Sequence, residues 1–332
     1  MKMLEYQRLI AQIDLDAIEN NVKQIKKQLD KGTKMLAVVK ADAYGHGAVE
    51  VSKICLFNGA DQLGIATCEE GCALREANIP VPILILGYTV ENRLETVIEN
   101  DLTQAVFSVE MAQKLSQTAV RMGKTAKAHI KIDTGMGRIG FLPCEESLDV
   151  IDGIFKLPNL EITGIFTHFS TADEKDKTFT KTQFERFLYM TRGLEERGHT
   201  GLIRHCANSG AIIDMPELQL DMVRAGIILY GMLPSTEVGT QLDLIPAMSL
   251  KTHISYVKQV EAGTPHRLRQ DVLHRQAVKD SDRAHRLCGR LQQGIFQQGA
   301  GHSQRRVRKC RGQCLHGPDN AGRDTYQGYK NG

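Results

Sequence analysis

Short apolar runs alternate along most of the chain with segments whose apolar residues recur at helical spacing. Repeated alternation of this kind is typical of parallel strands joined by crossover helices. Val109–Met122 and Thr178–Arg197 are the clearest helical segments. Eight strand-like runs favour a closed (β/α)8 barrel over an open sheet. The predicted strands cover residues 35–41, 62–66, 81–87, 103–108, 126–133, 160–168, 201–208 and 219–227.

Two further strand-like runs, Leu9–Leu15 and Ser249–Val260, fall outside this repeat. The first precedes a helical pattern that continues to about Leu29. We expect the two runs to pair in a second, mostly β domain, for which a chain of 332 residues has room beside a barrel. The predicted division is 1–14 for a strand of the second domain, 15–240 for the barrel, 241–265 for the start of the second domain, and 266–332 for a tail.

Composition narrows the class of protein. The N-terminus has no apolar stretch of signal-peptide length, and no run of apolar residues is long enough to span a bilayer, so we expect a cytoplasmic protein without a membrane partner. The eight cysteines do not form paired motifs with zinc-site spacing, and we expect no metal.

The charge is unevenly distributed. Residues 266–332 contain 11 Arg and 3 Lys against 5 Asp, a net charge of +9, within a chain of net charge +3. A basic segment can indicate nucleic-acid binding. This segment lacks interleaved aromatic residues, heptads and any known binding motif, and we expect no nucleic-acid partner.

The most distinctive motif is AVVKADAYGHG at residues 37–47, where Lys40 ends a buried strand. Burial lowers the pKa of a lysine, and the resulting neutral amine is suited to covalent bonding with a carbonyl carbon. Taken alone, the motif is equally compatible with a strand-end lysine that reaches solvent.

This motif and a second, DTGMGRIG at residues 133–140, resemble the two signatures of the alanine racemase family. The resemblance covers about residues 1–265. It implies a barrel that binds pyridoxal 5'-phosphate, a homodimer, and interconversion of L- and D-alanine, which supplies D-alanine for peptidoglycan.

The resemblance also assigns roles around the cofactor. Lys40 resembles the lysine that bonds to the cofactor aldehyde and then moves the substrate α-proton on one face. Arg224 resembles the arginine beside the pyridine nitrogen. A guanidinium cannot give its proton to the ring, so the ring is a weaker electron sink and clean reprotonation is favoured over side reactions.

Five residues are expected near the cofactor phosphate. Tyr44 resembles the family's phosphate-contacting tyrosine. The other four follow the seventh and eighth barrel strands, where barrels commonly bind phosphate through backbone N–H groups and a nearby helix start. They are Asn208, Ser209, Gly226 and Ile227.

Four more residues match the family's supporting groups. Arg138 resembles the arginine that holds the substrate carboxylate, and Lys131 aligns with a lysine that is carbamylated in some members and pairs with that arginine. His168 and His205, at the ends of the sixth and seventh strands, match histidines that form hydrogen bonds around the catalytic tyrosine and Arg224. The remaining histidines considered, His46, His129 and His253, are interpreted as structural.

The resemblance fails abruptly after VKQVEAGT at residues 257–264. The family's second base is a tyrosine in an Ile-Gly-Tyr-Ala-Asp-Gly segment of the β domain, and this sequence contains no such segment. When the codons for residues 285–299 are taken one base later, they can encode that segment. Residues 314–323 give a second family-like stretch under the same shift. We therefore predict a frameshift near residue 265, an out-of-frame and poorly folded tail, and impaired activity of the chain as written.

Other functions stay open at this point. The chief alternatives are a racemase for another small amino acid such as serine and a cofactor-binding barrel without catalysis. A related decarboxylase is disfavoured by the arginine at the ring nitrogen, and a basic-tailed nucleic-acid-binding protein is a remote alternative.

Overall fold

The computed structural model describes residues 9–239, 242–252, 254–260, 265–266, 272–273 and 278–283. The chain divides into two compact units. The larger comprises Ile13–Met248, and the smaller combines Met1–Gln12 with Ser249–Gly332. The unit boundary after Met248 lies eight residues beyond the expected end of the barrel domain at residue 240.

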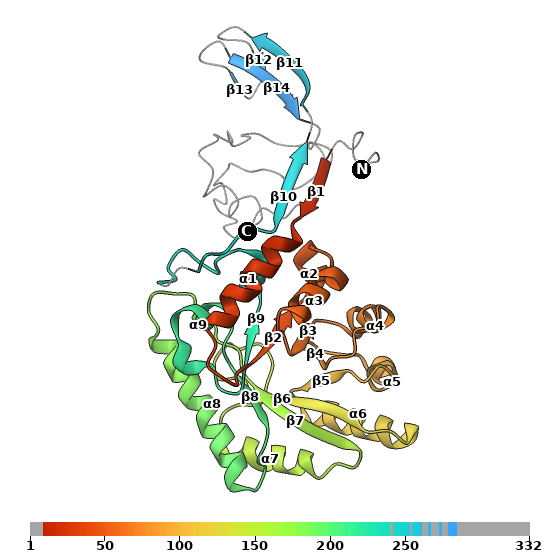
Figure 1. Cartoon of the computed structure of the whole chain (residues 1–332). Helices are drawn as coiled ribbons and strands as arrows, with labels where there is room; N and C mark the ends of the chain where they lie inside the picture. Colours follow the sequence, from red (N-terminus) through yellow and green to blue (C-terminus); the bar gives the residue numbers. More distant parts are fainter. Residues whose placement is uncertain are drawn as a thin grey trace, which may run out of the picture. The chain divides into compact units, whose positions relative to one another are not determined.

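Eight parallel strands form the centre of the larger unit, and they confirm the predicted barrel (Figure 1). The strands from β2 to β8 lie in sequence order, each paired with its neighbours, and β9 pairs with β2. Backbone hydrogen bonds from Asp221 N to Arg204 O (3.2 Å) and from Arg224 N to Ala207 O (2.9 Å) link β8 to β9 and close the ring. The strands are β2 (Lys34–Val38), β3 (Gln62–Ile65), β4 (Ile83–Ile85), β5 (Thr103–Val106), β6 (Ala126–Lys131), β7 (Leu160–Phe166), β8 (Ile203–His205) and β9 (Met222–Ala225).

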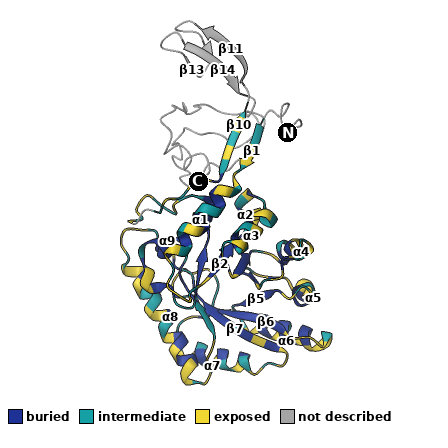
Figure 2. Cartoon of the chain, viewed as in Figure 1, coloured by how far each residue is buried: buried dark blue, intermediate teal, exposed yellow. Residues whose placement is uncertain are grey.

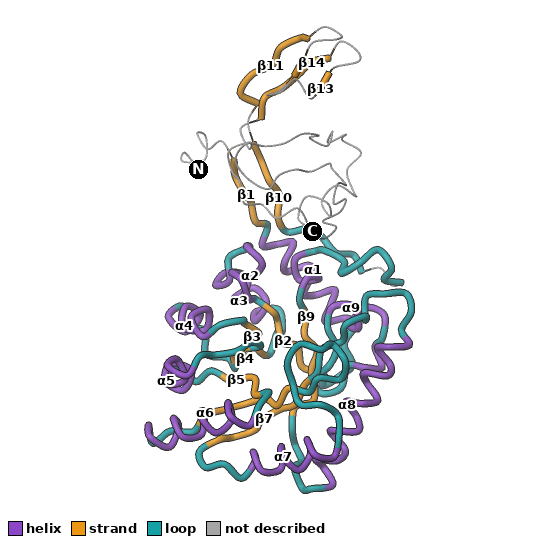
Figure 3. Tube along the Cα trace, turned by 180° about the vertical axis from the view of Figure 1, so that it is seen from behind, coloured by secondary structure: helices purple, strands orange, loops and turns teal. Residues whose placement is uncertain are grey.

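Helices surround these strands on the outside (Figures 1 and 3). The predicted helix at Val109–Met122 is α6, which begins where the Ser108 side chain accepts the Met111 N–H and ends at Gly123 in the left-handed conformation (φ 62°). The helix predicted from Thr178 is α8 (Thr178–Glu196). The others are α1 (Leu15–Lys27), α3 (Ala48–Phe57), α4 (Cys68–Glu76), α5 (Leu94–Glu99), α7 (Glu145–Phe155) and α9 (Ser209–Asp214), with 3-10 turns η1 (Glu91–Arg93), η2 (Pro216–Leu218) and η3 (Ile227–Tyr230).

The barrel strands are buried on both faces, whereas the helices expose their outer sides (Figure 2). All four residues of β3, β5 and β9 are buried, which explains why the strand signal was a continuous apolar run and not an alternation. The carboxyl ends of parallel strands meet at one end of a barrel. Polar side chains there are thus brought together from distant parts of the sequence.

The smaller unit contains short strand pairs. Strand β1 (Leu9–Ile13) pairs with β10 (Met248–Thr252), so the two runs outside the repeat do come together. The single strand expected at Ser249–Val260 is instead divided into β10 and β11 (Ile254–Val260). Residue His253, between them, lies outside the described residues.

Two further strand pairs lie at or beyond residue 254, and two of their strands fall within the predicted tail. Strand β14 (Val278–Arg283) pairs antiparallel with β11, and β13 (Val272–Leu273) pairs antiparallel with β12 (Pro265–His266). Backbone groups alone form such a ladder, so it does not require apolar alternation in the sequence. The remainder of the predicted tail lies outside the described residues.

Candidate active site

Lys40 stands at the start of an unusual turn that follows β2. Residues 41–44 in the short element α2 (Lys40–Gly45) all have positive φ angles, from 51° to 55°. Left-handed conformation costs a residue with a Cβ roughly 1–2 kcal/mol. Both carboxylate oxygens of Glu70 support the turn from α4, accepting the N–H groups of Ala41 and Ala66 at 2.7 Å each. Backbone strain of this kind is concentrated at functional sites.

Tyr44 ends the turn and packs on a buried tyrosine that the sequence analysis did not identify. The rings of Tyr44 and Tyr230 have centroids 5.0 Å apart, and the Tyr230 hydroxyl donates to Val38 O at 2.8 Å. His46 lies against the same ring at 4.5 Å and its Nδ1 is 3.0 Å from Ala43 O. Tyr230 therefore connects η3 to the end of β2 and fixes the position of Tyr44.

A small cradle lies between Tyr44 and the loops that follow β8 and β9. A Cβ built on Gly226 would be 3.4 Å from Ser209 Oγ and 3.7 Å from the Tyr44 hydroxyl. The Gly226 N–H donates to Ser209 Oγ at 3.1 Å, and Ile227 begins η3 directly afterwards. The Asn208 side chain caps α9 by accepting the Ala211 N–H, and it also donates to Phe169 O at 3.2 Å. The structure thus brings together the residues that were expected around a phosphate.

Arg224 is the centre of a buried polar network inside the barrel. Its guanidinium donates to three backbone oxygens, Thr167 O at 2.7 Å, His205 O at 3.0 Å and Cys206 O at 3.1 Å. It also lies 3.1 Å from His205 Nδ1 and 3.2 Å from His168 Nδ1. Burial lowers the pKa of Arg224 to about 10, so that the group is cationic at neutral pH.

The imidazoles around Arg224 are neutral. Burial, followed by the charge of Arg224, holds the pKa values of His168 and His205 well below their ordinary value. The network continues to His129, whose Nδ1 is 2.9 Å from His205 Nε2 and whose pKa burial lowers to about 3. His129 was interpreted only as structural from the sequence. Its position two residues before Lys131 on a strand of alternating faces was the available signal.

Two lysines at this end of the barrel are also shifted toward the neutral amine. Burial lowers the pKa of Lys40, and the nearby charge of Arg138 lowers it further. Lys131 is 3% exposed, and burial together with Arg224 lowers its pKa to about 7. Arg138 itself is exposed. Beyond the effect of burial, the charge of Arg138 lowers the pKa values of Lys40, Lys131 and Arg224, which indicates a positive local potential suited to anions.

The loop that carries Arg138 is closed by its own backbone. Phe141 N donates to Lys131 O and Asp133 N donates to Phe141 O, each at 2.9 Å. Asp133 Oδ1 accepts the N–H groups of Gly135 and Gly137. A Cβ on Gly140 would lie 2.4 Å from Asp133 N, so this close approach requires glycine. The DTGMGRIG motif is thus explained by a tight loop that begins one residue after Ile132.

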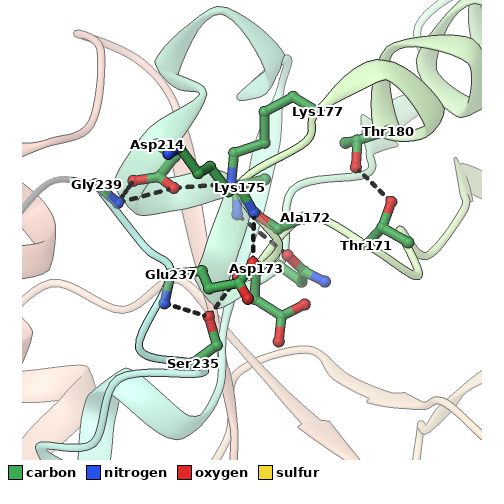
Figure 4. A network of polar contacts seen from close by, with 12 residues as sticks. Thr171, Ala172, Asp173, Lys175, Lys177, Thr180, Asp214, Ser235, Glu237 and Gly239 are labelled. Carbon is green, nitrogen blue, oxygen red and sulfur yellow. Dashed lines mark hydrogen bonds and ion pairs between the residues drawn. The ribbon is translucent and has the colours of Figure 1, made fainter.

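A separate polar network fastens the loop that follows β7 (Figure 4). Lys177 Nζ donates to Asp214 Oδ2 at 2.8 Å and to Ala172 O at 2.7 Å. Asp214 also accepts the Gly239 N–H at 3.0 Å, and Glu237 accepts the Lys175 N–H at 2.9 Å. The network joins residues 172–177, the end of α9 and residues 237–239. It therefore connects the loop after His168 to the helix that begins at Ser209.

The arrangement as a whole defines a class of protein, a barrel whose strand ends present a lysine of lowered pKa, a glycine beside two hydroxyl groups and a buried guanidinium. Residues 13–234 match the family model described as alanine racemase, N-terminal domain. The chain belongs to this family, whose members depend on pyridoxal phosphate.

Named relatives agree with this assignment. The chain is 53% identical over 254 residues to an alanine racemase of Clostridium tetani and 50% identical over 255 residues to one of Methanococcus maripaludis. Each alignment covers 76% of this chain, and they cover 65% and 68% of the relatives. The chain therefore spans about two thirds of the length of these curated relatives.

Solved structures show the same fold. The chain resembles alanine racemase of Clostridium difficile 630 with a TM-score of 0.80 and 43% identity, over 83% of this chain and 73% of that one. It resembles the Bacillus anthracis alanine racemase, solved with bound L-Ala-P, with a TM-score of 0.76 and 35% identity, over 82% and 70% of the two chains.

Proposed function

We propose that this chain binds pyridoxal 5'-phosphate at the carboxyl ends of its barrel strands and that it is built for the interconversion of L- and D-alanine. The observation that carries the proposal is the cradle at Gly226, flanked by Ser209 Oγ and the Tyr44 hydroxyl, beside the cationic cluster around Lys40. An anionic cofactor with an aldehyde matches both features. When bound, it supplies the electron sink that lets an α-proton leave an amino acid.

Four residues have roles near the reacting atoms and the ring nitrogen. Lys40, with its lowered pKa, is the amine for the cofactor aldehyde and the base for the α-proton on one face. Arg224 would offer the ring nitrogen a fixed positive charge without giving up a proton, since its pKa of about 10 keeps it protonated. His168 and His205 hold that guanidinium in place.

The remaining roles concern the two anionic ends of the ligand. The phosphate would be held by Ser209, Gly226, Ile227 and Tyr44, and Asn208 caps the start of α9 next to Ser209. Arg138 is exposed and would attract the substrate carboxylate. Burial and the charges of Arg224 and Arg138 all lower the pKa of Lys131. Its pKa of about 7 makes it a reactive amine for carbamylation by CO2.

The direct test is covalent trapping. The purified protein is incubated with pyridoxal phosphate, reduced with borohydride and digested, and the labelled peptide is identified by mass spectrometry. We expect the label on Lys40, with none in Lys40→Arg under the same conditions. A label spread over surface lysines and unchanged in Lys40→Arg would overturn the proposal.

Activity is a separate question, because racemisation needs a proton donor on each face of the α-carbon. We propose that the chain as written lacks the second donor and is impaired, and that a frameshift near residue 265 is the reason. Sequencing the gene across codons 255–300 decides the cause. Robust D-alanine formation by this chain would refute the impairment.

The setting of the protein follows from the family. We propose a cytoplasmic homodimer that supplies D-alanine for peptidoglycan. In the described part of the chain, no helix is long and apolar enough to cross a membrane. Light scattering of the purified protein measures the oligomeric state, and a monomer at micromolar concentration would contradict the dimer.

A further inference from the structure

Helix α8 lies on the outside of the barrel, yet one of its side chains reaches the loops at the active-site end. Gln183 is fully buried. Its Oε1 accepts the Ser170 N–H at 2.9 Å and the Ser170 hydroxyl at 3.2 Å. Its Nε2 donates to Thr134 Oγ1 at 3.2 Å and to His168 O at 3.3 Å. A primary amide has two acceptor positions and two donors, and all four are used here.

These four bonds tie two functional loops to one point. Thr134 belongs to the loop that leads to Arg138, whereas His168 and Ser170 belong to the loop after β7. The contact is reinforced on both sides, since Thr134 Oγ1 is 2.8 Å from Thr167 Oγ1 and Arg186 NH1 donates to Thr134 O at 2.9 Å.

Adjacent positions of α8 serve the same loops. Thr180 Oγ1, three residues before Gln183, lies 3.0 Å from Thr171 Oγ1 (Figure 4). Arg186 follows three residues after Gln183. Residues at this spacing share one face of a helix. One face of α8 is thus dedicated to positioning the two loops.

We propose that Gln183 is a positioning residue that sets the spacing between the Arg138 loop and His168, and through them the substrate and cofactor contacts. The functional half of this proposal rests on the proposed function above. The amide is specific for the task, because a carboxylate would face His168 O without a hydrogen to donate, and an apolar side chain would leave Ser170 N, Thr134 and His168 O without this partner.

The first test is hydrogen exchange of the cofactor-free protein. In Gln183→Met we expect exchange in residues 133–140 and 168–171 to accelerate roughly tenfold, as for loss of a buried hydrogen bond. In Gln183→Glu we expect Ser170 to keep its protection and residues 133–140 to lose it, because the acceptor survives and the donors do not. The second variant also decides the matter if Gln183→Met fails to fold.

The matched control is Thr191→Val on the same helix. Thr191 is buried and its hydroxyl donates to Leu188 O at 3.1 Å, within α8 and away from both loops. It should loosen the helix locally without changing exchange in either loop. Two outcomes would overturn the positioning role of Gln183. One is that exchange accelerates equally over the whole barrel in the control and in the Gln183 variants. The other is that exchange in the two loops does not change in the Gln183 variants.

The second test measures the affinity for pyridoxal phosphate by absorbance titration. We expect at least a tenfold weaker affinity in Gln183→Met and unchanged affinity in Thr191→Val. If the unaltered protein does not bind pyridoxal phosphate, the proposed function fails, while the exchange data still decide whether Gln183 holds the loops. If the loops loosen but affinity is unchanged, the functional half of the proposal is wrong.

Discussion

The His129 Nδ1 atom accepts a hydrogen bond from His205 Nε2 at 2.9 Å, and this bond depends on Arg224 at the other side of His205. A guanidinium can only donate, so His205 Nδ1, 3.1 Å from Arg224 NH1, must be the unprotonated ring nitrogen. His205 then carries its hydrogen on Nε2 and donates it to His129. One fixed cation thus sets the tautomers of two buried imidazoles.

Nitrogen NMR of protein with 15N-labelled histidine tests the two hydrogen bonds, from Arg224 to His205 and from His205 to His129. We expect His129 and His205 both as neutral Nε2–H tautomers from roughly pH 5 to pH 8, since burial lowers both pKa values. A hydrogen on His205 Nδ1, or titration of either buried ring in this range, would contradict the network.

Gly164 makes room for the second ring of this network. A Cβ at Gly164 would lie 2.7 to 2.8 Å from three atoms of the His129 imidazole. We expect Gly164→Ala to reduce the free energy of unfolding by about 1–3 kcal/mol through overpacking. Gly153→Ala on α7, with nothing within 4 Å, is the control and should be neutral or stabilising by up to about 1 kcal/mol. Denaturant unfolding of the two variants measures the difference, and equal effects would show that the ring moves freely.

The barrel was predictable because most residues of its strands are buried, in β3, β5 and β9 along the whole strand, so that the strands appear as mainly apolar runs. The short strands β4 and β8 lie inside the predicted runs 81–87 and 201–208, but each run extends two or three residues beyond the ends of its strand. The paired strands after residue 265 were missed. Residues 278–283 carry Val278 as their only apolar side chain, and a backbone ladder leaves little trace in such a segment.

Residues of the proposed site could be named from the sequence where a motif, a strand end or the family resemblance marked them. Lys40 and Arg138 lie in two long motifs, so the resemblance assigned them at once. Gln183 and Tyr230 lie in ordinary amphipathic or apolar segments, and their importance depends on which loops they reach in three dimensions. Nothing in the spacing of QFERF at residues 183–187 distinguishes a loop-binding amide from a surface glutamine.

Arg224 stabilises the barrel through the shape of its guanidinium as well as through its charge, and Arg224→Lys separates the two contributions. Lysine keeps the positive charge but has three donors on one nitrogen, which cannot reach five acceptors arranged around a planar fork. We expect a loss of about 3–5 kcal/mol in the free energy of unfolding, as for breaking a buried charge network. Arg204→Lys on β8, partly exposed beside Asp221, should cost less than about 1 kcal/mol. Urea unfolding measures both variants. A loss of stability in Arg224→Lys as small as that in Arg204→Lys would show that the positive charge of Arg224 suffices without the guanidinium geometry.

The stability of the barrel should depend on pH through Lys131. Its pKa in the folded chain is about 7, below the ordinary value of 10.5. Between these values the unfolded chain binds more protons than the folded chain, so stability rises with pH across this window. The free-energy cost of burying the charged Lys131 ammonium is fully present below pH 7 and is absent above pH 10.5. Its size is on the order of a few kcal/mol.

Lys131→Met removes this penalty, so the variant should gain stability relative to the unaltered protein at low pH, and the difference should shrink as pH rises toward 10.5. Lys127→Met is the control, because Lys127 is on the same strand but its side chain is partly exposed and pairs with Asp101 at the surface. Urea unfolding at a series of pH values measures both. Carbamylation would replace the amine by an anion, so added bicarbonate should flatten the difference between the Lys131 variant and the unaltered protein. A difference that does not vary with pH in the absence of bicarbonate would show that Lys131 is charged inside the folded barrel.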